Sequence, residues 1–446
     1  MTHVKFESFV SRSEAQASHR IGFIGLGQCG GNYTDLFSSL KDNNKKSFYD
    51  CIAINSFLGD LKSLKNIPHD RKYALVGVEG GCGRKPELAK EALKNPDNQN
   101  RLIELIKSNL MDNPMYIVNA GLGGGTGTGI IVTMIKLLHK VINVPLIKQG
   151  KKPKPIGAIV TIPRKSEAPA EKKNALNAIK QIEKMMNSKE YEFKFIIIVD
   201  NEKAYREFKQ LDLKNDTKFD NWMDYCNQQI VESIHEVNVA TSFSSDKSFD
   251  PQEVLNIYGE WEGALTLGKI KFKSKDIIDS IDLVNKIVKT FQEGSVLADG
   301  FNLENTRTAG VLIVKPTSNK IISKNSLYDI EDKLAEIMPS SLYRSTGYIE
   351  WYNPNDTIIY TMAKVQELPE RAREGLSLEY NATMNKIKEN VKNTKIKTEY
   401  SDIDDDIFNS QSSKQINDNF DPFSDEAAAS DDLKEDEDFS DVFDLD

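Results

Sequence analysis

The residues best suited to binding chemistry form a glycine-rich segment at residues 121–129, with the sequence Gly-Leu-Gly-Gly-Gly-Thr-Gly-Thr-Gly. Its six glycines allow backbone dihedrals that other residues avoid and let the backbone approach a ligand closely. The hydroxyls of Thr126 and Thr128, together with the free N–H groups at a helix start, add donors for an anion. We therefore expect a phosphate-binding loop. It is not a P-loop, because the closing Lys-Ser/Thr pair is missing.

Hydrophobic segments on both sides must position this loop. Residues 115–118 are typical of a buried strand, and residues 130–141 of a helix that is hydrophobic on nearly every face. A flexible glycine linker would not lie between two buried elements. The loop is therefore expected to connect a strand to a helix inside a folded domain.

A second glycine motif, GxGxxG at residues 25–30, follows a strand expected at residues 20–24. This pattern occurs in dinucleotide-binding oxidoreductases, which are therefore an alternative. That class needs an acidic residue after the second strand to hold a ribose hydroxyl, but the strand expected at residues 51–54 ends in Asn55. A dehydrogenase would also have no use for the second glycine loop a hundred residues later. The oxidoreductase is therefore disfavoured.

Strand-like and helix-like segments alternate through the first 200 residues. Further strands are expected at residues 73–76, 156–161 and 193–199, and the last is almost continuously apolar, as a strand covered on both faces should be. This alternation predicts an α/β fold with a parallel, doubly wound, Rossmann-like sheet. A third glycine-rich loop, at residues 77–84, also follows a strand. The glycine loops should meet at the carboxyl edge of the sheet, where such folds bind ligands.

The nonapeptide at residues 121–129 resembles the signature of the tubulin and bacterial cell-division tubulin (FtsZ) superfamily, and the resemblance extends over about residues 20–365. Asp-Asn-Glu-Lys-Ala-Tyr at residues 200–205 is similar to the guanine-contacting segment Asp-Asn-Glu-Ala-Leu-Tyr of tubulin, although by itself it could be an ordinary polar loop. An asparagine amide can donate and accept on one purine edge, which suits guanine. The resemblance assigns this role to Asn201 and Asn227.

Asn227 belongs to a segment with the spacing of an amphipathic helix, at about residues 221–236. In the superfamily a long central helix occupies this place and joins the two domains. The apolar positions expected to face the core are Met223, Cys226, Ile230, Ile234 and Val237.

An acidic pair, Asp250 and Glu253, follows this helix. Taken alone, Asp-Pro-Gln-Glu is typical of a helix N-terminus, with Asp250 as cap and Pro251 in the first turn. The superfamily has Asp-x-x-Asp/Glu here, inserted into the nucleotide pocket of the next filament subunit, where the acids position the attacking water. The resemblance therefore implies that Asp250 and Glu253 are catalytic. The chain departs from the family pattern at Ser248, where asparagine is usual.

The resemblance implies a GTP/GDP pocket with Mg²⁺, whose ligands the sequence does not identify. The three glycine loops would hold the phosphates, the two asparagines would contact the base, and one of two glutamates would lie near the ribose. The residues expected to contact the nucleotide are Gly27, Gln28, Cys29, Asn32, Asn55, Gly80, Gly81, Gly123, Gly124, Gly125, Thr126, Gly127, Thr128, Gly129, Glu167, Glu171, Asn201 and Asn227.

Strand-like and helix-like segments continue to residue 365 and predict a second α/β domain, followed by a charged, helix-prone stretch. In the plasmid-type members of the superfamily, a long helix at this place contacts the neighbouring subunit. The expected organisation is a loose N-terminal arm (1–19), a GTP-binding domain (20–217), the central helix and its connection (218–249), an activation domain (250–365), a C-terminal helix (366–400) and a disordered acidic tail (401–446).

Charge is distributed unevenly. Residues 401–446 contain 17 Asp/Glu against two lysines, a net charge of −15, which leaves +6 on the rest of a chain whose total is −9. The composition of this tail cannot support a core.

The remaining bulk features point to a cytoplasmic protein without direct membrane insertion. The four cysteines lack metal-ligand spacing, and no apolar run approaches the roughly 18 residues that a membrane span needs. The polar N-terminus does not resemble a signal peptide. Without a secretory signal, the cysteines are expected to be reduced thiols.

The resemblance implies a GTPase that polymerises head to tail and hydrolyses GTP across the subunit interface. Within the superfamily the long C-terminal helix and acidic tail best fit the plasmid- or phage-segregation tubulins (TubZ), with a basic DNA-binding adaptor as the expected partner of the tail. A cell-division protein like FtsZ is the main alternative, and a non-polymerising nucleotide-binding enzyme is a weaker one.

Overall fold

The computed structural model describes residues 7–11, 15–214, 219–243, 245, 247–293, 295–351 and 355–393. The chain divides into two units, Met1–Tyr380 and Asn381–Asp446, and the fold and the site belong to the first. The tail expected to be disordered, residues 401–446, lies outside the described residues.

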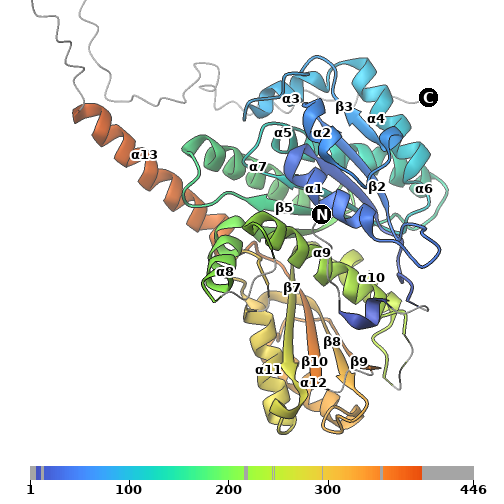
Figure 1. Ribbon diagram of the computed structural model, residues 1–446. Helices are drawn as coiled ribbons and strands as arrows, with labels where there is room; N and C mark the ends of the chain where they lie inside the picture. The colour runs from blue at the N-terminus through green and yellow to red at the C-terminus, as the bar shows by residue number, and fades with distance from the viewer. Residues whose placement is uncertain are drawn as a thin grey trace, which may run out of the picture. The chain divides into compact units, whose positions relative to one another are not determined.

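The first six strands form the predicted parallel sheet (Figure 1). Their order is β3-β2-β1-β4-β5-β6, and every neighbouring pair among them is parallel. The expected strands all form, with ends that differ by at most three residues. The strands are β1 (Gly22–Leu26), β2 (Asp50–Asn55), β3 (Lys72–Ala74), β4 (Tyr116–Gly121), β5 (Ile156–Ile162) and β6 (Phe193–Asp200).

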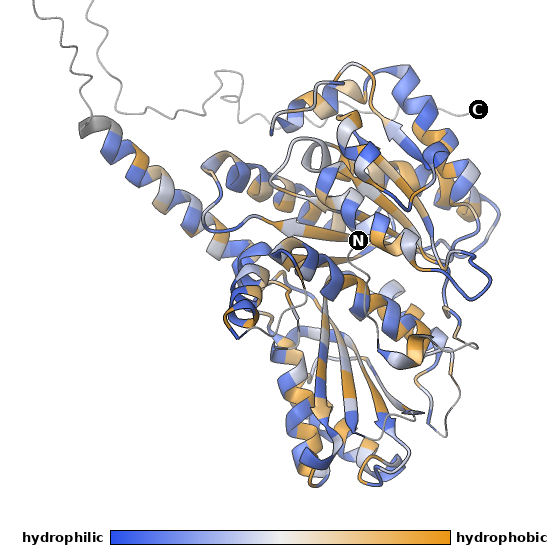
Figure 2. Cartoon of the chain, in the orientation of Figure 1, coloured by the Kyte–Doolittle hydropathy of each residue, from blue (hydrophilic) through white to orange (hydrophobic). Residues whose placement is uncertain are grey.

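Helices cover both faces of this sheet, as its hydrophobic strands require (Figure 2). α1, α2 and α9 share a core with one face, while α3, α4, α5 and α7 pack on the other. The helices of this part are α1 (Gly27–Ser39), α2 (Leu58–Ser63), α3 (Pro86–Ala92), α4 (Pro96–Asn109), α5 (Thr126–Leu138), α6 (Val144–Lys148), α7 (Pro169–Ser188), α8 (Asn201–Leu213) and α9 (Trp222–Ala240).

The second α/β region continues the same sheet, because β6 pairs with β7 over two residues. The remaining order is β7-β10-β8-β9, with β10 antiparallel to both neighbours and β8 parallel to β9. Its elements are α10 (Pro251–Gly259), β7 (Gly263–Lys273), α11 (Ser280–Glu293), β8 (Thr306–Pro316), α12 (Lys324–Ile337), β9 (Tyr343–Trp351) and β10 (Asp356–Val365); α13 (Leu376–Asn393) follows.

The central helix α9 forms as predicted but extends four residues further, to Ala240. Its N-cap is Asn221, whose side chain accepts a hydrogen bond from the backbone N–H of Asp224. Four of the five expected apolar positions are buried, but Met223 is exposed, whereas Trp222 and Tyr225 of the same turn contact the core. The long burial of α9 explains why it connects the two halves of the sheet.

The described part of the N-terminal arm is packed, which corrects the expectation of a loose arm. Phe9 is fully buried and makes edge contacts with Phe243 and Trp351. The backbone N–H of Glu7 donates to Glu236 on α9 at 2.9 Å. A few apolar residues in a polar stretch gave no periodic signal, although one buried aromatic ring is enough to hold such a segment.

A buried ion cluster joins α9 to the second region. The ammonium of Lys269 on β7 lies 2.7 Å from Glu236 and 3.1 Å from Glu232, both on α9. Tyr360 on β10 donates its hydroxyl to Glu236 at 2.6 Å. Removing one member would leave a buried charge unpaired, so the cluster holds α9 in register against β7 and β10.

One helical stretch, residues 126–148, is long and apolar enough to cross a membrane by length and composition. The stretch is not one uninterrupted apolar run, since Lys136, His139 and Lys140 interrupt it without lowering its mean hydropathy enough to exclude it. Half of the apolar window is buried inside the protein, as in the core helix of a folded domain.

Candidate functional site

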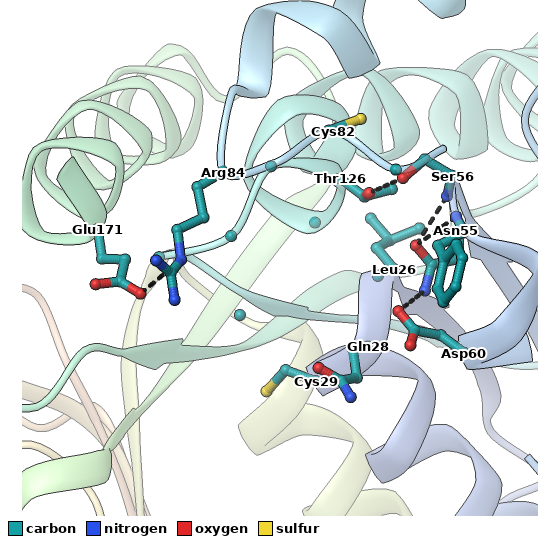
Figure 3. A pocket seen from close by; sticks show the side chains of 18 of the residues that line it. Leu26, Gln28, Cys29, Asn55, Ser56, Asp60, Cys82, Arg84, Thr126 and Glu171 are labelled. Carbon is teal, nitrogen blue, oxygen red and sulfur yellow. Dashed lines mark hydrogen bonds and ion pairs between the residues drawn. The ribbon is translucent and has the colours of Figure 1, made fainter. Parts of the chain in front are cut away.

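A cavity of about 410 Å³ opens at the carboxyl ends of the parallel strands (Figure 3). Its walls come from the loops after β1, β2, β4 and β5, the loop after β3, and the first residue of α8. The loops that the sequence predicted to converge on one edge therefore do so.

The glycine segment at residues 121–129 forms one wall, and close contacts explain its composition. A Cβ on Gly125 would lie 2.6 Å from the Cβ of Cys82, and one on Gly127 would lie 3.0 Å from the carbonyl oxygen of Leu26. At Gly124 no atom lies within 4 Å of such a Cβ, so this glycine leaves room in the cavity. α5 begins at Thr126 without a side-chain cap, so its first N–H groups are available to an anion.

The first glycine motif contributes the adjoining wall, since a Cβ on Gly27 would lie 3.1 Å from the backbone nitrogen of Gly127. Gly27 begins α1 directly after β1 and has φ +67°, a conformation that glycine adopts without strain. Gly30 does not line the cavity; a Cβ there would lie 1.9 Å from the carbonyl oxygen of Asn119 on β4. Gly27 therefore shapes the turn, and Gly30 lets α1 pack closely on the sheet.

Thirteen of the predicted nucleotide-binding residues line the cavity. They are Gly27, Gln28, Cys29, Asn55, Gly81, Gly123, Gly124, Gly125, Thr126, Gly127, Glu167, Glu171 and Asn201.

Five of the predicted nucleotide-binding residues lie outside the lining. Asn32 is exposed on α1, and Gly80 pairs with Phe57 beside the cavity. Thr128 donates its hydroxyl to the carbonyl of Gly121 at 3.3 Å, and Gly129 serves packing, because a Cβ there would lie 2.4 Å from Pro86 O. Asn227 is half-buried on α9, next to Cys226.

Cys226 shows how close the start of α9 comes to the cavity floor. Its sulfur lies 3.8 Å from the hydroxyl of Tyr33, and that hydroxyl lies 3.2 Å from the hydroxyl of Thr161, a lining residue. The part of α9 that carries Asn227 therefore lies behind the cavity wall at Thr161.

Beside the predicted Asn55, the lining residues Ser56 and Asp60 form a part of the site that the sequence reasoning missed. The amide oxygen of Asn55 accepts from the backbone N–H of Ser56, and its nitrogen donates to Asp60 at 3.0 Å. Ser56 and Thr126 share a hydrogen bond of 2.6 Å between their hydroxyls. Asp60 lies six residues beyond the predicted end of the strand at residue 54, and the sequence marks it only as a carboxylate near the edge expected to bind the ligand.

The loop after β5 brings two glutamates to the rim. Glu167 accepts from the backbone N–H of Arg164 at 2.9 Å, and burial raises the pKa of its carboxyl. Glu171 accepts from the backbone N–H of Ala168 at 2.6 Å and forms an ion pair with Arg84 at 2.8 Å. A Cβ on Gly123 would lie 3.2 Å from the Cβ of Glu171 and 3.7 Å from a carboxylate oxygen of Glu167, so both glutamate side chains lie beside the glycine loop.

The donor set does not make a complete metal site. Among the described residues, no group of three or more His, Cys, Asp or Glu side chains could hold a metal ion. Asp60 and the paired hydroxyls of Ser56 and Thr126 nevertheless offer oxygen atoms near the glycine loop, and Mg²⁺ takes such ligands together with phosphates and waters. The residues present therefore fit a Mg²⁺ ion that arrives with a phosphorylated ligand.

Asp250 and Glu253 lie outside the cavity, as the capping box of α10. The carboxylate of Asp250 accepts from the backbone N–H of Glu253 at 2.9 Å, and that of Glu253 accepts from the N–H of Asp250 at 2.8 Å. Both side chains are at the protein surface. The cap predicted from Asp-Pro-Gln-Glu is therefore confirmed.

Lys364 on β10 holds the other end of α10. Its buried ammonium donates to three backbone carbonyls, of Tyr258 (2.8 Å), Glu260 (2.9 Å) and Trp261 (3.1 Å). The helix is thus fixed at its C-terminus while its N-terminal carboxylates face outward.

A parallel sheet, three convergent glycine loops and an uncapped helix start define a nucleotide-binding α/β protein. The model of the Tubulin/FtsZ family, GTPase domain, matches residues 20–209, and that of the Tubulin/FtsZ-like protein TubZ-like, C-terminal domain, matches residues 236–376. The chain belongs to the tubulin/FtsZ superfamily, with a C-terminal domain of the TubZ-like type.

Individual relatives agree with this membership. Tubulin-like protein TubZ of Bacillus cereus is 29% identical over 309 residues, covering 66% of this chain and 64% of that protein, slightly less than two thirds of its length. TubZ of Bacillus thuringiensis subsp. israelensis is 26% identical over 396 residues, covering 81% and 77%. A GTPγS-form protofilament structure of the latter organism's TubZ has a TM-score of 0.72 at 22% identity, covering 87% of this chain and 98% of that one, and so shares the fold.

Proposed function

We propose that this protein is a GTPase that assembles head to tail into filaments and hydrolyses GTP at the junction between subunits. One observation supports this most: the cavity holds the phosphate loops, while the exposed carboxylates of Asp250 and Glu253 stand on α10, outside it. Glu167 and Glu171, at the rim, are engaged by backbone N–H groups of their own loop. A second subunit that brings α10 to the cavity would complete the site.

GTP binds in the cavity with its phosphates against the glycine loops and the start of α5. Bound Mg²⁺ would neutralise phosphate charge, and Asp60, Ser56 and Thr126 are the residues placed to hold its waters. Asn201 at the start of α8 and Asn227 at the start of α9 contact the base. Thr128, Gly129, Asn32 and Gly80 support the loops from positions just outside the lining.

Hydrolysis needs a base beside the attacking water. Glu253 is the better candidate for this role, with Asp250 orienting it, because their mutual cap fixes both carboxylates on a rigid helix end. Since neither subunit has a complete site, turnover depends on assembly, and GDP accumulates in subunits behind a growing end.

The biological role we propose is segregation of plasmid or phage DNA in the cytoplasm. A TubZ-like C-terminal domain supports this over the cell-division alternative. One solved structural relative is described as a type III plasmid segregation TubZ, and others as two-stranded and four-stranded TubZ filaments.

Guanine contact through Asn201 predicts weaker GTP binding when its amide is removed. Asn201→Ala should raise the Kd for GTP about tenfold or more, because an unpaired polar group in a closed base pocket costs about 1–3 kcal/mol. Lys209→Ala, on the same helix but paired at the surface with Asp212, is the matched control and should bind normally. Calorimetric titration measures both; equal affinities would remove Asn201 from the site.

The acidic tail is the proposed docking segment for a basic, DNA-bound adaptor. Its −15 charge would attract a basic partner, and its phenylalanines would anchor it, namely Phe408, Phe420, Phe423, Phe439 and Phe443. Truncation at Ser401 should leave GTPase activity and assembly intact but abolish adaptor capture. Capture by the full chain should weaken as salt rises. Pull-downs with both forms decide this, and equal capture would reduce the tail to a spacer.

A further inference from the structure

An ion pair spans the mouth of the cavity between two separate elements. The guanidinium of Arg84, in the loop between β3 and α3, lies 2.8 Å from the carboxylate of Glu171 on α7 (Figure 3). The glutamate side chain is 9% exposed, whereas the arginine side chain is 64% exposed. The guanidinium is therefore open to solvent and to a ligand, whereas the carboxylate is buried.

Arg84 is the one cationic side chain among the described residues that line the cavity. The carboxylates of Asp60, Glu167 and Glu171 also line it. A cavity with three carboxylates and one guanidinium is poorly suited to a polyphosphate while that guanidinium is neutralised by Glu171. Phosphate oxygens would therefore compete with Glu171 for Arg84, and the planar guanidinium matches them with two parallel hydrogen bonds.

The backbone at Arg84 supports a role for its side chain. Its φ is +65°, in the left-handed region that glycine adopts without strain and other L-residues adopt rarely. The side-chain amide of Asn174 on α7 donates to the carbonyl oxygens of Arg84 (2.9 Å) and Gly123 (3.2 Å). These bonds hold the backbone of Arg84 beside the glycine loop at residues 121–129. A loop that supplied only backbone N–H groups would do so more readily with glycine here.

We propose that Arg84 is a phosphate-binding residue whose guanidinium pairs with Glu171 in this structure and transfers to the nucleotide's phosphates on binding. This deepens the proposed function and rests on it. Glu171 then holds the guanidinium of Arg84 until a nucleotide binds. The hydrogen bond that its carboxylate accepts from the N–H of Ala168 keeps the Glu171 side chain in place after Arg84 leaves. Affinity at this pocket should consequently depend on Arg84 more strongly as the number of phosphates increases.

The test compares GTPγS, GDP and GMP binding by calorimetry, at protein concentrations where sedimentation shows only monomer. Arg84→Ala should weaken GTPγS binding at least about tenfold, GDP binding less, and GMP binding less than about twofold. Arg84→Lys should have a GTPγS affinity between those of wild type and Arg84→Ala, since lysine keeps the positive charge but cannot donate two parallel hydrogen bonds. Lys85→Ala, the adjacent cation outside the lining, is the matched control and should change none of the three.

A double-mutant cycle tests the exchange itself. Glu171→Gln keeps an acceptor for the N–H of Ala168 but releases Arg84, so GTPγS affinity should rise severalfold. The same change in the Arg84→Ala background should produce no gain. A Glu171→Gln variant that loses GTPγS affinity equally in both backgrounds would overturn the exchange.

Two further results would overturn the assignment of Arg84: equal losses for all three nucleotides, as expected of a structural residue, or no loss for any. If the wild-type protein bound none of the three, the failure would be that of the proposed function. If it bound them and Arg84→Ala kept the wild-type affinities, only the role of Arg84 would be wrong.

Discussion

Replacing Glu253 with alanine is expected to slow GTP hydrolysis at least about a hundredfold while leaving GTP binding and filament assembly intact. The carboxylate lies outside its own subunit's cavity, so nucleotide binding does not depend on it. Filaments of this variant should accumulate and stop turning over. Phosphate release and sedimentation, measured on the same samples, give both quantities.

The capping role of Glu253 requires a second variant. Glu253→Gln keeps an oxygen that can accept from the N–H of Asp250, so it preserves the cap while removing the base. It should be as slow as the alanine variant. Gln252→Ala, which removes a neighbouring side chain bonded only to Asn256 in the same helix, should hydrolyse at the normal rate. Normal hydrolysis by Glu253→Gln would show that the water is positioned by another group.

The second large effect is expected at Gly30. Gly30→Ala should lower the free energy of unfolding by about 1–3 kcal/mol or prevent folding, because its Cβ would lie 1.9 Å from the backbone oxygen of Asn119. α1 and β4 would have to separate, and both carry loops of the nucleotide pocket.

Gly124→Ala is the matched comparison, since no atom lies within 4 Å of its new Cβ. The urea concentration at its unfolding midpoint should equal that of wild type, although the added methyl group would occupy space in the ligand cavity. Urea unfolding of both variants separates packing glycines from binding glycines. Equal stability of Gly30→Ala and wild type would contradict the close approach of α1 to the sheet.

Sequence reasoning predicted the nucleotide-binding half of the fold well because its signals are local. Buried parallel strands such as β5 and β6 are nearly continuous hydrophobic runs, and each glycine loop directly follows a strand. The carboxyl edge of the sheet then brings those loops together without any long-range information. This explains why residues as distant as Gly27 and Gly125 could be assigned to one pocket.

The features that escaped prediction depend on partners far away in the sequence. The ion pair of Arg84 requires Glu171, which lies 87 residues later in the sequence. The N-terminal arm is fixed by Phe9 through contacts with Phe243 and Trp351. The buried Lys269 and Glu236 pair likewise requires β7 to lie against α9. No local periodicity records such pairings, because they arise only when the elements pack.

Asn227 shows a different limit. The resemblance placed it at the base, yet it does not line the cavity, while Asn201 does. The sulfur of its neighbour Cys226 lies 3.8 Å from the hydroxyl of Tyr33, which contacts the hydroxyl of the lining residue Thr161. A contact between Asn227 and the base therefore stays a prediction.

The claim that each active site is shared by two subunits is tested most directly by GTP turnover per subunit as a function of protein concentration. Turnover should be negligible below a critical concentration and rise steeply above it, because only a junction brings Asp250 and Glu253 to a bound nucleotide. Turnover per subunit that stays constant from the monomeric to the assembled range would contradict the account and identify a self-contained nucleotide-hydrolysing enzyme.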